Sequence, residues 1–182
     1  RFLGKQKPRL VDTGSTEMNL APIDSLCLLF QATREPRYLL LARQIADEFG
    51  ATDAAGKLLA GNYLLAALDG KEFYQSPKPR WESLHPILGL VRLYYLTGDA
   101  RYRQAFTHWW WSIVKLDRHN NGGFSSGEQA QGNPYHQGAS ETCCTIAWLA
   151  MSVEMLQLTG DSIVADEMEL STLNSVVGMH SP

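Results

Sequence analysis

The stretch HPILGLVRLYYLTGDARYRQAFTHWWWSIVKL, residues 85–116, decides the fold. Apolar residues recur at helical spacing on both sides of the central Thr97-Gly98-Asp99. Glycine allows a helix to end in the left-handed conformation, and aspartate is a preferred cap for the helix that follows. The stretch therefore predicts two helices, residues 85–96 and 100–116, that fold back on each other as a hairpin.

The same construction occurs twice more in the chain, and its predicted helices are residues 24–33, 36–49, 143–158 and 162–177. The three turns, at Thr33, Thr97 and Thr159, are about 63 residues apart. A near-constant period of this size is typical of stacked helical hairpins, which bury their faces against neighbouring hairpins. We therefore expect an all-α protein, either an α-solenoid or a closed α/α toroid in which inner and outer helices alternate.

The ends of the helices and the middle of the chain carry weaker signals. Asp24 is the expected cap of the first helix, and Asp99 and Asp161 are the expected caps of two later ones. Between the first two hairpins, the leucines of residues 58–68 predict a helix interrupted by glycine, followed by a polar loop. No segment has the alternating pattern of a β-strand.

The composition is that of a globular domain: 182 residues, 45% of them hydrophobic, and a net charge of −3 from 16 Lys+Arg and 19 Asp+Glu. There is no run of five like charges, and no uncharged apolar stretch reaches the ~18 residues of a membrane span, so we expect neither a nucleic-acid nor a membrane partner. The chain begins at Arg1 without the pattern of a signal peptide, so it is expected to be a piece of a longer product of unassigned localisation.

The most unusual stretch is NNGGFSSGEQAQGNPYHQGASETCC, residues 120–144, a polar loop between two apolar helices. Long loops of this kind within compact domains are usually functional or disordered. Glu141 and Cys143 stand two residues apart at the start of a helix, and a carboxylate and a thiolate can both bind zinc. The alternative is that Glu141 stabilises the helix end, while Cys143 and Cys144 pack as small apolar residues. With only three cysteines, no disulfide framework is expected.

Three other residues of this loop are candidates. Glu128 follows a glycine and could act as a general acid and base, although such a residue is often merely solvated. Tyr135 and His136 are possible substrate contacts, with ordinary solvation as the alternative. In the preceding helix, Trp109, Trp110 and Trp111 sweep about 200° around the axis, so we expect them to pack against different neighbours rather than to form one sugar-stacking platform.

GGFSSGE, SETCCTIAW and LTGDSIVADEMELSTLNSVVG together resemble the glycoside hydrolase family 127 of β-L-arabinofuranosidases. The resemblance extends from about Trp81 to the end of the chain. It implies an (α/α)6 barrel followed by β-rich domains, and retaining hydrolysis of β-linked L-arabinofuranosides with a zinc-bound cysteine as nucleophile. Residues 1–182 are then expected to form a single, partial catalytic domain, with the remaining barrel and any β domains outside the chain.

Carried over to this sequence, the resemblance implies that Glu128 is the general acid/base. Glu141 and Cys143 are implied as zinc ligands, and His85 as a contact to the carbohydrate substrate. The family pattern has a further cysteine pair downstream, which contains the nucleophile and the remaining zinc ligands, and the chain reaches Pro182 before such a pair. The chain alone is therefore expected to be inactive. Cys144 is expected to serve the core, because adjacent helical residues point about 100° apart.

Two alternatives remain open from the sequence. A sugar epimerase or an unsaturated glucuronyl hydrolase could use a similar barrel without zinc. A non-catalytic helical repeat could instead bind a partner on its concave face. In either case the exposed edges of the outer hairpins could lead to self-association.

Overall fold

A computed structural model describes residues 9–12, 16–125 and 127–179. Its α-helices are α1 (Thr16–Leu20), α2 (Ile23–Thr33), α3 (Pro36–Asp47), α4 (Tyr63–Leu68), α5 (Leu84–Thr97), α6 (Ala100–Leu116), α7 (Thr142–Thr159) and α8 (Ser162–Leu170). A π-helical segment, Ser171–Val177, continues α8, and short 3₁₀ turns include Trp81–Ser83 before α5. Within the described ranges the only β pairing is three isolated bridges, so the prediction of an all-α fold is confirmed.

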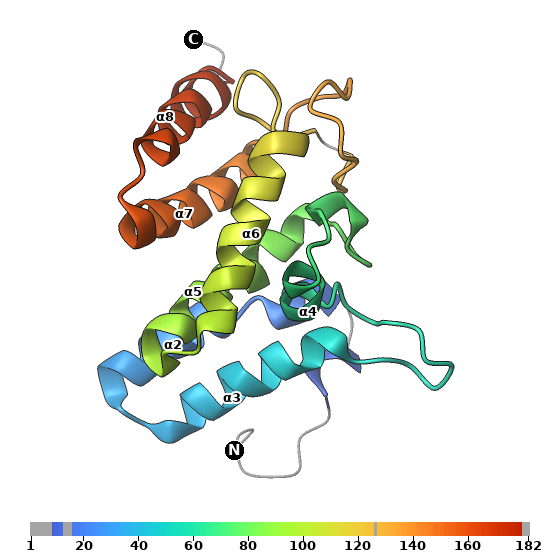
Figure 1. Cartoon of the computed structure of the whole chain (residues 1–182), viewed down its shortest axis with the longest axis vertical. Coiled ribbons are helices and arrows are strands. Elements are labelled where there is room, and N and C mark those ends of the chain that lie inside the picture. Colours follow the sequence, from blue (N-terminus) through green and yellow to red (C-terminus); the bar gives the residue numbers. More distant parts are fainter. Residues whose placement is uncertain (1–8, 13–15, 126, 180–182) are drawn as a thin grey trace.

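The helices form three antiparallel hairpins, α2/α3, α5/α6 and α7/α8, as the sequence predicted (Figure 1). The first helices of the hairpins pack side by side in the order α2, α5, α7. These first helices form one layer, and each second helix packs on the first helix of its own hairpin, α3 on α2, α6 on α5 and α8 on α7; α4 packs on α6. Helical hairpins stacked in this way are the construction of a helical toroid, and the chain supplies part of one.

The three hairpin turns are built in the same way. In each, a threonine hydroxyl donates to the carbonyl four residues earlier and accepts the N–H two residues later; the threonines are Thr33, Thr97 and Thr159. Gly98 and Gly160 end their helices in the left-handed conformation, and Arg34 does so in the first turn. This shared geometry explains why a threonine stands at the end of the first helix in each hairpin.

Two details of the predicted helices are wrong. Asp24 does not cap α2; Pro22 stands at the cap, and Asp24 lies in the first turn, where its carboxylate pairs with Arg92. The helix expected around Leu58 does not form either, because Thr52 and Leu58 pair as an antiparallel bridge around the turn at Gly56. Helix begins only at Tyr63, after Asn62 in the left-handed conformation.

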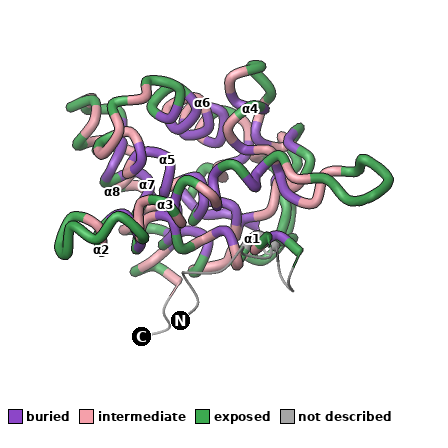
Figure 2. The backbone as a smooth tube through the Cα atoms, turned by 90° about the horizontal axis from the view of Figure 1, so that it is seen from below, coloured by how far each residue is buried: buried purple, intermediate pink, exposed green. Residues whose placement is uncertain are grey.

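The largest fully buried side chains of the core are aromatic. Figure 2 shows the buried stretches of the backbone in the interior of the molecule. The tryptophans of α6 point to different neighbours, as predicted. Trp109 donates to the carbonyl of Tyr63 beside α4, whereas Trp110 donates to Ser152 and stacks on Trp148 of α7, with ring centroids 5.1 Å apart. Trp109 and Trp110 are fully buried and Trp111 is half-buried, so they hold α6 in place.

An ion triad joins the three helices of the first layer. Arg92 of α5 donates to Asp24 of α2 at 2.7 Å and to Glu154 of α7 at 2.6 Å. The Glu154 side chain is only 6% exposed, so its charge depends on this partner.

The row of first-layer helices exposes apolar side chains at both ends, Leu28 and Leu29 on α2 and Ile146 and Val153 on α7. Self-association through these edges stays a prediction. One helix of the described part, Thr142–Thr159, is long and apolar enough to cross a membrane, with a mean hydropathy of 1.2. It is α7, and the core helix of a soluble protein passes the same test.

Candidate active site

A pocket of about 100 Å³ lies where three segments meet. The 3₁₀ turn and the first turn of α5 form one wall, the loop between α6 and α7 forms the second, and the start of α7 forms the third. The lining residues are Trp81, Glu82, His85, Glu128, Glu141, Cys143, Cys144 and Ala147. The pocket therefore gathers three carboxylates, one imidazole and two thiols.

Aromatic packing fixes the loop that carries Glu128. Phe124 is fully buried between Trp81 and Trp148, with ring centroids 4.8 and 5.8 Å away. The carbonyl of Phe124 also accepts the N–H of Glu141 at 2.9 Å. The GGFSSGE segment is thus tied to the 3₁₀ turn before α5 and to α7 at the same residue, and this brings two distant parts of the sequence to one pocket.

Glu128 stands at a bend of this loop. Its carbonyl accepts the N–H of Trp81, and the next residues pair with Pro79 and Arg80 through the N–H of Ala130 and an antiparallel bridge at Gln129. Glu128 itself has a φ of 59°. A non-glycine residue in this left-handed region persists only where its surroundings define it strongly, and such residues cluster at functional sites.

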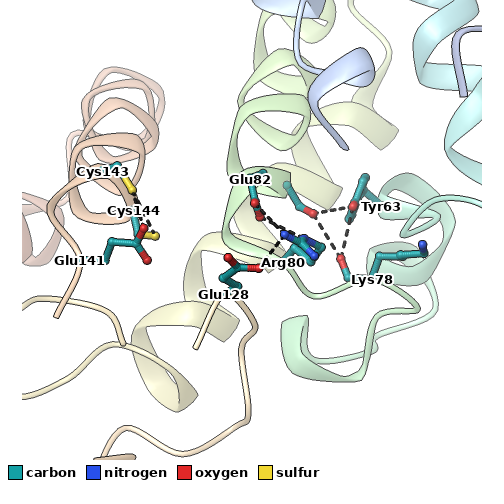
Figure 3. Close-up of polar contacts among 9 residues, drawn as sticks. Tyr63, Lys78, Arg80, Glu82, Glu128, Glu141, Cys143 and Cys144 are labelled. Carbon is teal, nitrogen blue, oxygen red and sulfur yellow. Dashed lines mark hydrogen bonds and ion pairs between the residues drawn. The ribbon is translucent and has the colours of Figure 1, made fainter. Parts of the chain in front are cut away.

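Arg80 orients the carboxylate of Glu128 (Figure 3). Its guanidinium donates to Glu128 at 2.9 Å and also binds Glu82 with two nitrogens, at 3.2 and 2.9 Å. The hydrogen bond to Arg80 holds the pKa of Glu82 below its ordinary value. The side chain of Glu128 is 63% exposed, so a ligand in the pocket can reach its carboxylate.

Glu141, Cys143 and Cys144 form a compact cluster at the start of α7 (Figure 3). The thiol of Cys143 donates to Glu141 Oε1 at 3.1 Å, and its sulfur lies 3.9 Å from that of Cys144. One donor atom from each residue lies within 4.8 Å of the others. A carboxylate and two thiols at these separations fit a zinc ion, which prefers such donors in a tetrahedral arrangement.

The pKa values of both thiols of the cluster lie above their ordinary value. Burial, assisted by the neighbouring Glu141 carboxylate, raises the pKa of Cys143, and burial with the adjacent Cys143 raises that of Cys144. A metal bound here must therefore displace the thiol protons.

Cys144 departs from the sequence-based prediction in one respect. It is buried, 6% exposed, as a core residue should be, but its sulfur also faces the same pocket as Cys143. The 100° between neighbouring helical positions describes the direction of Cβ. The sulfur lies one rotatable bond further out, and different χ1 rotamers can bring two such atoms together.

The other predicted site residues lie in two places. His85, in the first turn of α5, is exposed and lines the pocket with Glu128. Tyr135 and His136 lie outside it and line a wide, open basin of about 810 Å³ together with His119, Asn121 and Asn174. The basin is rich in uncharged polar groups, and the ring of Tyr135 is 79% exposed there.

The buried carboxylate of Asp117 secures the far side of the loop. It follows the last residue of α6, and its Oδ1 accepts the N–H groups of Gln131 and Gly132 at 3.2 and 2.9 Å. Gly132 has a φ of 65° and a Cβ there would meet the ring of Tyr74 at 2.7 Å, so the tight approach requires glycine. Burial raises the pKa of Asp117 to about 6, although these N–H groups act in the opposite direction.

We expect this carboxyl to make stability depend on pH. The folded state binds its proton more tightly than the unfolded chain, so the free energy of unfolding should fall as pH rises from about 4 to above 6. In Asp117→Asn, which keeps an acceptor for both N–H groups, this fall should shrink by an amount on the order of 1–3 kcal/mol. Denaturant unfolding at several pH values measures it.

The matched control is Asp53→Asn. Asp53 accepts two backbone N–H groups in the same way, at 2.9 and 3.0 Å, but is exposed. That substitution removes a carboxylate acceptor of two N–H groups without changing a buried group. Equal slopes in the wild type and Asp117→Asn would contradict the role of burial.

Four residues of the site were not selected from the sequence. Trp81 and Glu82 belong to a 3₁₀ turn in a polar loop, and Arg80 precedes them. Asp117 is an ordinary helix-end residue in the sequence. Trp81 and Glu82 stand next to the start of a predicted helix, which is a local signal in the sequence. Only the fold brings these two residues, Arg80 and Asp117 to the loop between α6 and α7.

The chain is thus a segment of a toroid built from helical hairpins, and it carries a pocket lined by carboxylates and thiols. The family described as the β-L-arabinofuranosidase GH127 catalytic domain matches residues 5–182. The chain belongs to this family, glycoside hydrolase family 127. The match favours a glycoside hydrolase over the two alternatives considered from the sequence, a sugar epimerase or glucuronyl hydrolase and a non-catalytic helical repeat.

Solved structures agree on the fold. A protein described as a glycoside hydrolase shares 22% identity with the chain at a TM-score of 0.67, over 93% of this chain and 32% of that one. A GH127 β-L-arabinofuranosidase from Geobacillus stearothermophilus T6 shares 21% at 0.62, over 88% and 28%. A GH127 β-arabinofuranosidase shares 19% at 0.55, over 100% and 36%. The chain thus spans about a third of each structure. No curated protein sequence matches it.

Proposed function

We propose that the protein containing this chain is a retaining glycoside hydrolase that acts on β-linked L-arabinofuranosides. The observation that carries the proposal is the pocket in which Glu128, His85, Glu141 and Cys143 meet, on a chain that belongs to family 127. Residues 1–182 then make up part of its catalytic barrel.

Glu128 is the proposed general acid and base. In the first step its carboxyl group gives a proton to the departing glycosidic oxygen, and in the second its carboxylate takes a proton from water. Arg80 supports this role by holding the exposed carboxylate toward the pocket. The imidazole of His85 can hydrogen-bond sugar hydroxyls from the opposite wall.

Glu141 and Cys143 are the proposed zinc ligands of this segment. Zinc, when bound, supplies positive charge that keeps a coordinated thiol deprotonated at neutral pH. The nucleophile implied by the family resemblance is a cysteine outside this chain, so the isolated chain should bind but not hydrolyse. Tyr135 and His136, in the separate basin, are proposed to contact a more distant part of the carbohydrate.

Hydrolysis by the protein that contains this chain tests the proposal. The 4-nitrophenyl β-L-arabinofuranoside should be cleaved, the α-anomer should not, and the first product observed by NMR should keep the β configuration. Inversion of configuration, or equal cleavage of both anomers, would contradict the proposed reaction.

Zinc binding by the chain provides a second test. Removal of Cys143 takes away one metal donor, so Cys143→Ser should weaken zinc affinity by about 10–100-fold or more, since even loss of an outer partner of a metal ligand has an effect of that size. Titration against a competing chromophoric chelator measures the affinity. Equal binding by the wild type and Cys143→Ser would refute the metal assignment.

A further inference from the structure

We propose that the basin lined by Tyr135 is a second carbohydrate subsite, which takes the uncharged sugar chain attached to the cleaved arabinofuranose. This subsite rests on the proposed function, and it extends the contacts of Tyr135 and His136 to a complete site for one class of ligand. The protein then selects long, neutral substrates. The size, the position and the lining of the basin all support this role.

The two cavities differ in the size of ligand that they can hold. Sites for small molecules usually have volumes of about 300–1,000 Å³. The pocket at Glu128 has about 100 Å³ and falls below that range, whereas the basin has about 810 Å³ and lies within it. The pocket is therefore too small for a whole oligosaccharide, and the remaining sugars need a second place to bind.

A single backbone segment separates the two cavities. Ser140 lines the basin, and Glu141, the next residue, lines the pocket. Ser140 pairs with Ser125 in an antiparallel bridge, and the N–H of Glu141 donates to the carbonyl of Phe124 at 2.9 Å, so this segment is fixed. A sugar chain that leaves the pocket over this segment enters the basin.

The lining of the basin matches neutral sugars. None of the described residues that line it is Asp, Glu, Lys or Arg; its polar side chains are amides, imidazoles, a phenol and a hydroxyl. Amides and hydroxyls both donate and accept hydrogen bonds, as sugar hydroxyls require. Carboxylates, in contrast, are usually bound by Arg or Lys. Burial and the nearby His136 lower the pKa of His119, which favours its uncharged form.

Tyr135 gives the basin an apolar surface. It is 79% exposed, and the turn that carries it is held by Asn133, whose side-chain oxygen accepts the N–H of Tyr135 at 3.0 Å and whose carbonyl accepts the N–H of His136 at 3.1 Å. An aromatic ring left in water gains free energy when an apolar surface covers it, and one face of a sugar ring is such a surface.

Asn174 lines the basin from a different element. It belongs to the π-helical segment Ser171–Val177, and π-helices are rare and frequently found at functional sites. Two serines of this segment, Ser171 and Ser175, donate to carbonyls of the loop between α6 and α7, each at 2.8 Å. These bonds fix Asn174 relative to the loop that forms the rest of the basin.

Calorimetric titration of the protein that contains this chain tests the subsite. The protein carries Glu128→Gln, so that bound sugars are not cleaved. Affinity for neutral arabino-oligosaccharides with a terminal β-L-arabinofuranose should rise by about 10-fold or more from the disaccharide to the tetrasaccharide, because the added units bury surface in the basin. An oligogalacturonate of the same length should not displace the tetrasaccharide.

Two further substitutions in this background address the basin directly. Tyr135→Ala removes the aromatic surface, and Asn174→Ala removes a hydrogen-bonding amide. Each should weaken binding of the tetrasaccharide by about 3–10-fold, and binding of the disaccharide by less. Tyr95→Ala is the matched control, because Tyr95 is 39% exposed on α5 and lines neither cavity, so it should keep both affinities. Circular dichroism confirms that each variant is folded.

The outcomes separate the subsite from the proposed reaction. Equal affinities for the disaccharide and the tetrasaccharide before any basin substitution would overturn the subsite, and so would a tetrasaccharide affinity that neither Tyr135→Ala nor Asn174→Ala changes. Displacement by the oligogalacturonate would overturn the selection for neutral chains. Failure of the wild type to cleave the nitrophenyl arabinofuranoside would overturn the proposed reaction, whereas the titrations would still decide whether the basin binds sugars.

Discussion

Replacing Glu128 with glutamine should lower kcat for an arabinofuranosyl disaccharide by about 10²–10⁴-fold, the usual contribution of a general acid or base. The amide keeps the size of the side chain and a hydrogen bond acceptor for Arg80, but it cannot deliver a proton. Steady-state kinetics on the protein that contains this chain, with circular dichroism of the variant, measures the effect.

The leaving group provides an internal check on this prediction. A nitrophenolate leaves without protonation, so Glu128→Gln should slow the first step of nitrophenyl arabinoside cleavage much less than that of the disaccharide. A purely structural role would slow both equally. Glu35→Gln, at an exposed carboxylate between α2 and α3, should change neither rate.

The neighbouring carboxylate of Glu82 is the alternative acid. It lines the same pocket and shares Arg80 with Glu128, but it accepts two hydrogen bonds from Arg80 where Glu128 accepts one, and these hold the pKa of Glu82 below its ordinary value. Glu82→Gln should therefore have the smaller effect. A larger loss of kcat in Glu82→Gln than in Glu128→Gln would transfer the role of acid/base to Glu82.

The second large effect concerns the ion triad between α2, α5 and α7. Arg92→Met should lower the free energy of unfolding by about 3–5 kcal/mol, because it leaves the buried carboxylate of Glu154 without its cation. Partial exposure of Asp24 places the effect toward the lower end of that range. Denaturant unfolding followed by circular dichroism measures it.

The effect of Arg92→Met should also depend on pH. Burial raises the pKa of Glu154, and Arg92 opposes that rise. Without Arg92 the folded state takes up a proton more readily than the unfolded chain, so the loss of stability should be smaller at about pH 5 than at about pH 8. A loss independent of pH would show that methionine disturbs packing rather than charge.

Arg101→Met is the control for the triad. Arg101 pairs with Asp99 at 2.6 Å, but its side chain is 63% exposed. Exposed pairs contribute little to stability because solvent screens them, so this variant should remain close to the wild type. If Arg101→Met lost as much stability as Arg92→Met, burial of the ion pair would not explain the effect of Arg92→Met.

The hairpins were predictable because their signals are local. A helix needs only apolar residues at helical spacing, and its end needs a cap within a few residues. The helix ends predicted from Gly98 and Gly160, and the helix starts predicted from Asp99 and Asp161, are therefore correct. The first hairpin was found from the same spacing, although Asp24 was taken for a cap when its charge serves a contact with α5.

The segment between α3 and α5 was the least predictable part of the fold. Leu58 and Leu59 have the composition of a helix, but an antiparallel bridge to Thr52 fixes this stretch as a turn. Such a competition between local preference and tertiary pairing is decided by contacts that the sequence pattern does not contain.

The candidate site was only partly predictable. Glu141 and Cys143 are neighbours in the sequence, and Glu128 stands in an unusual loop, so all three could be selected before the fold was known. Other features of the site depend on how the loop returns across the start of α5. They are the hydrogen bonds of Arg80 to Glu82 and Glu128, and the position of Tyr135 and His136 in a separate basin.

The sequence alone determined an all-α chain of repeated hairpins and the chemistry available in its longest loop. These properties depend on the order of apolar, capping and polar residues along the chain. The tertiary structure decided which donors share one pocket. Phe124 ties the loop to α7 and to the 3₁₀ turn before α5, and side-chain rotation brings the sulfur of Cys144 beside that of Cys143. Helical periodicity fixes the direction of each Cβ, whereas packing decides where the reactive atoms lie.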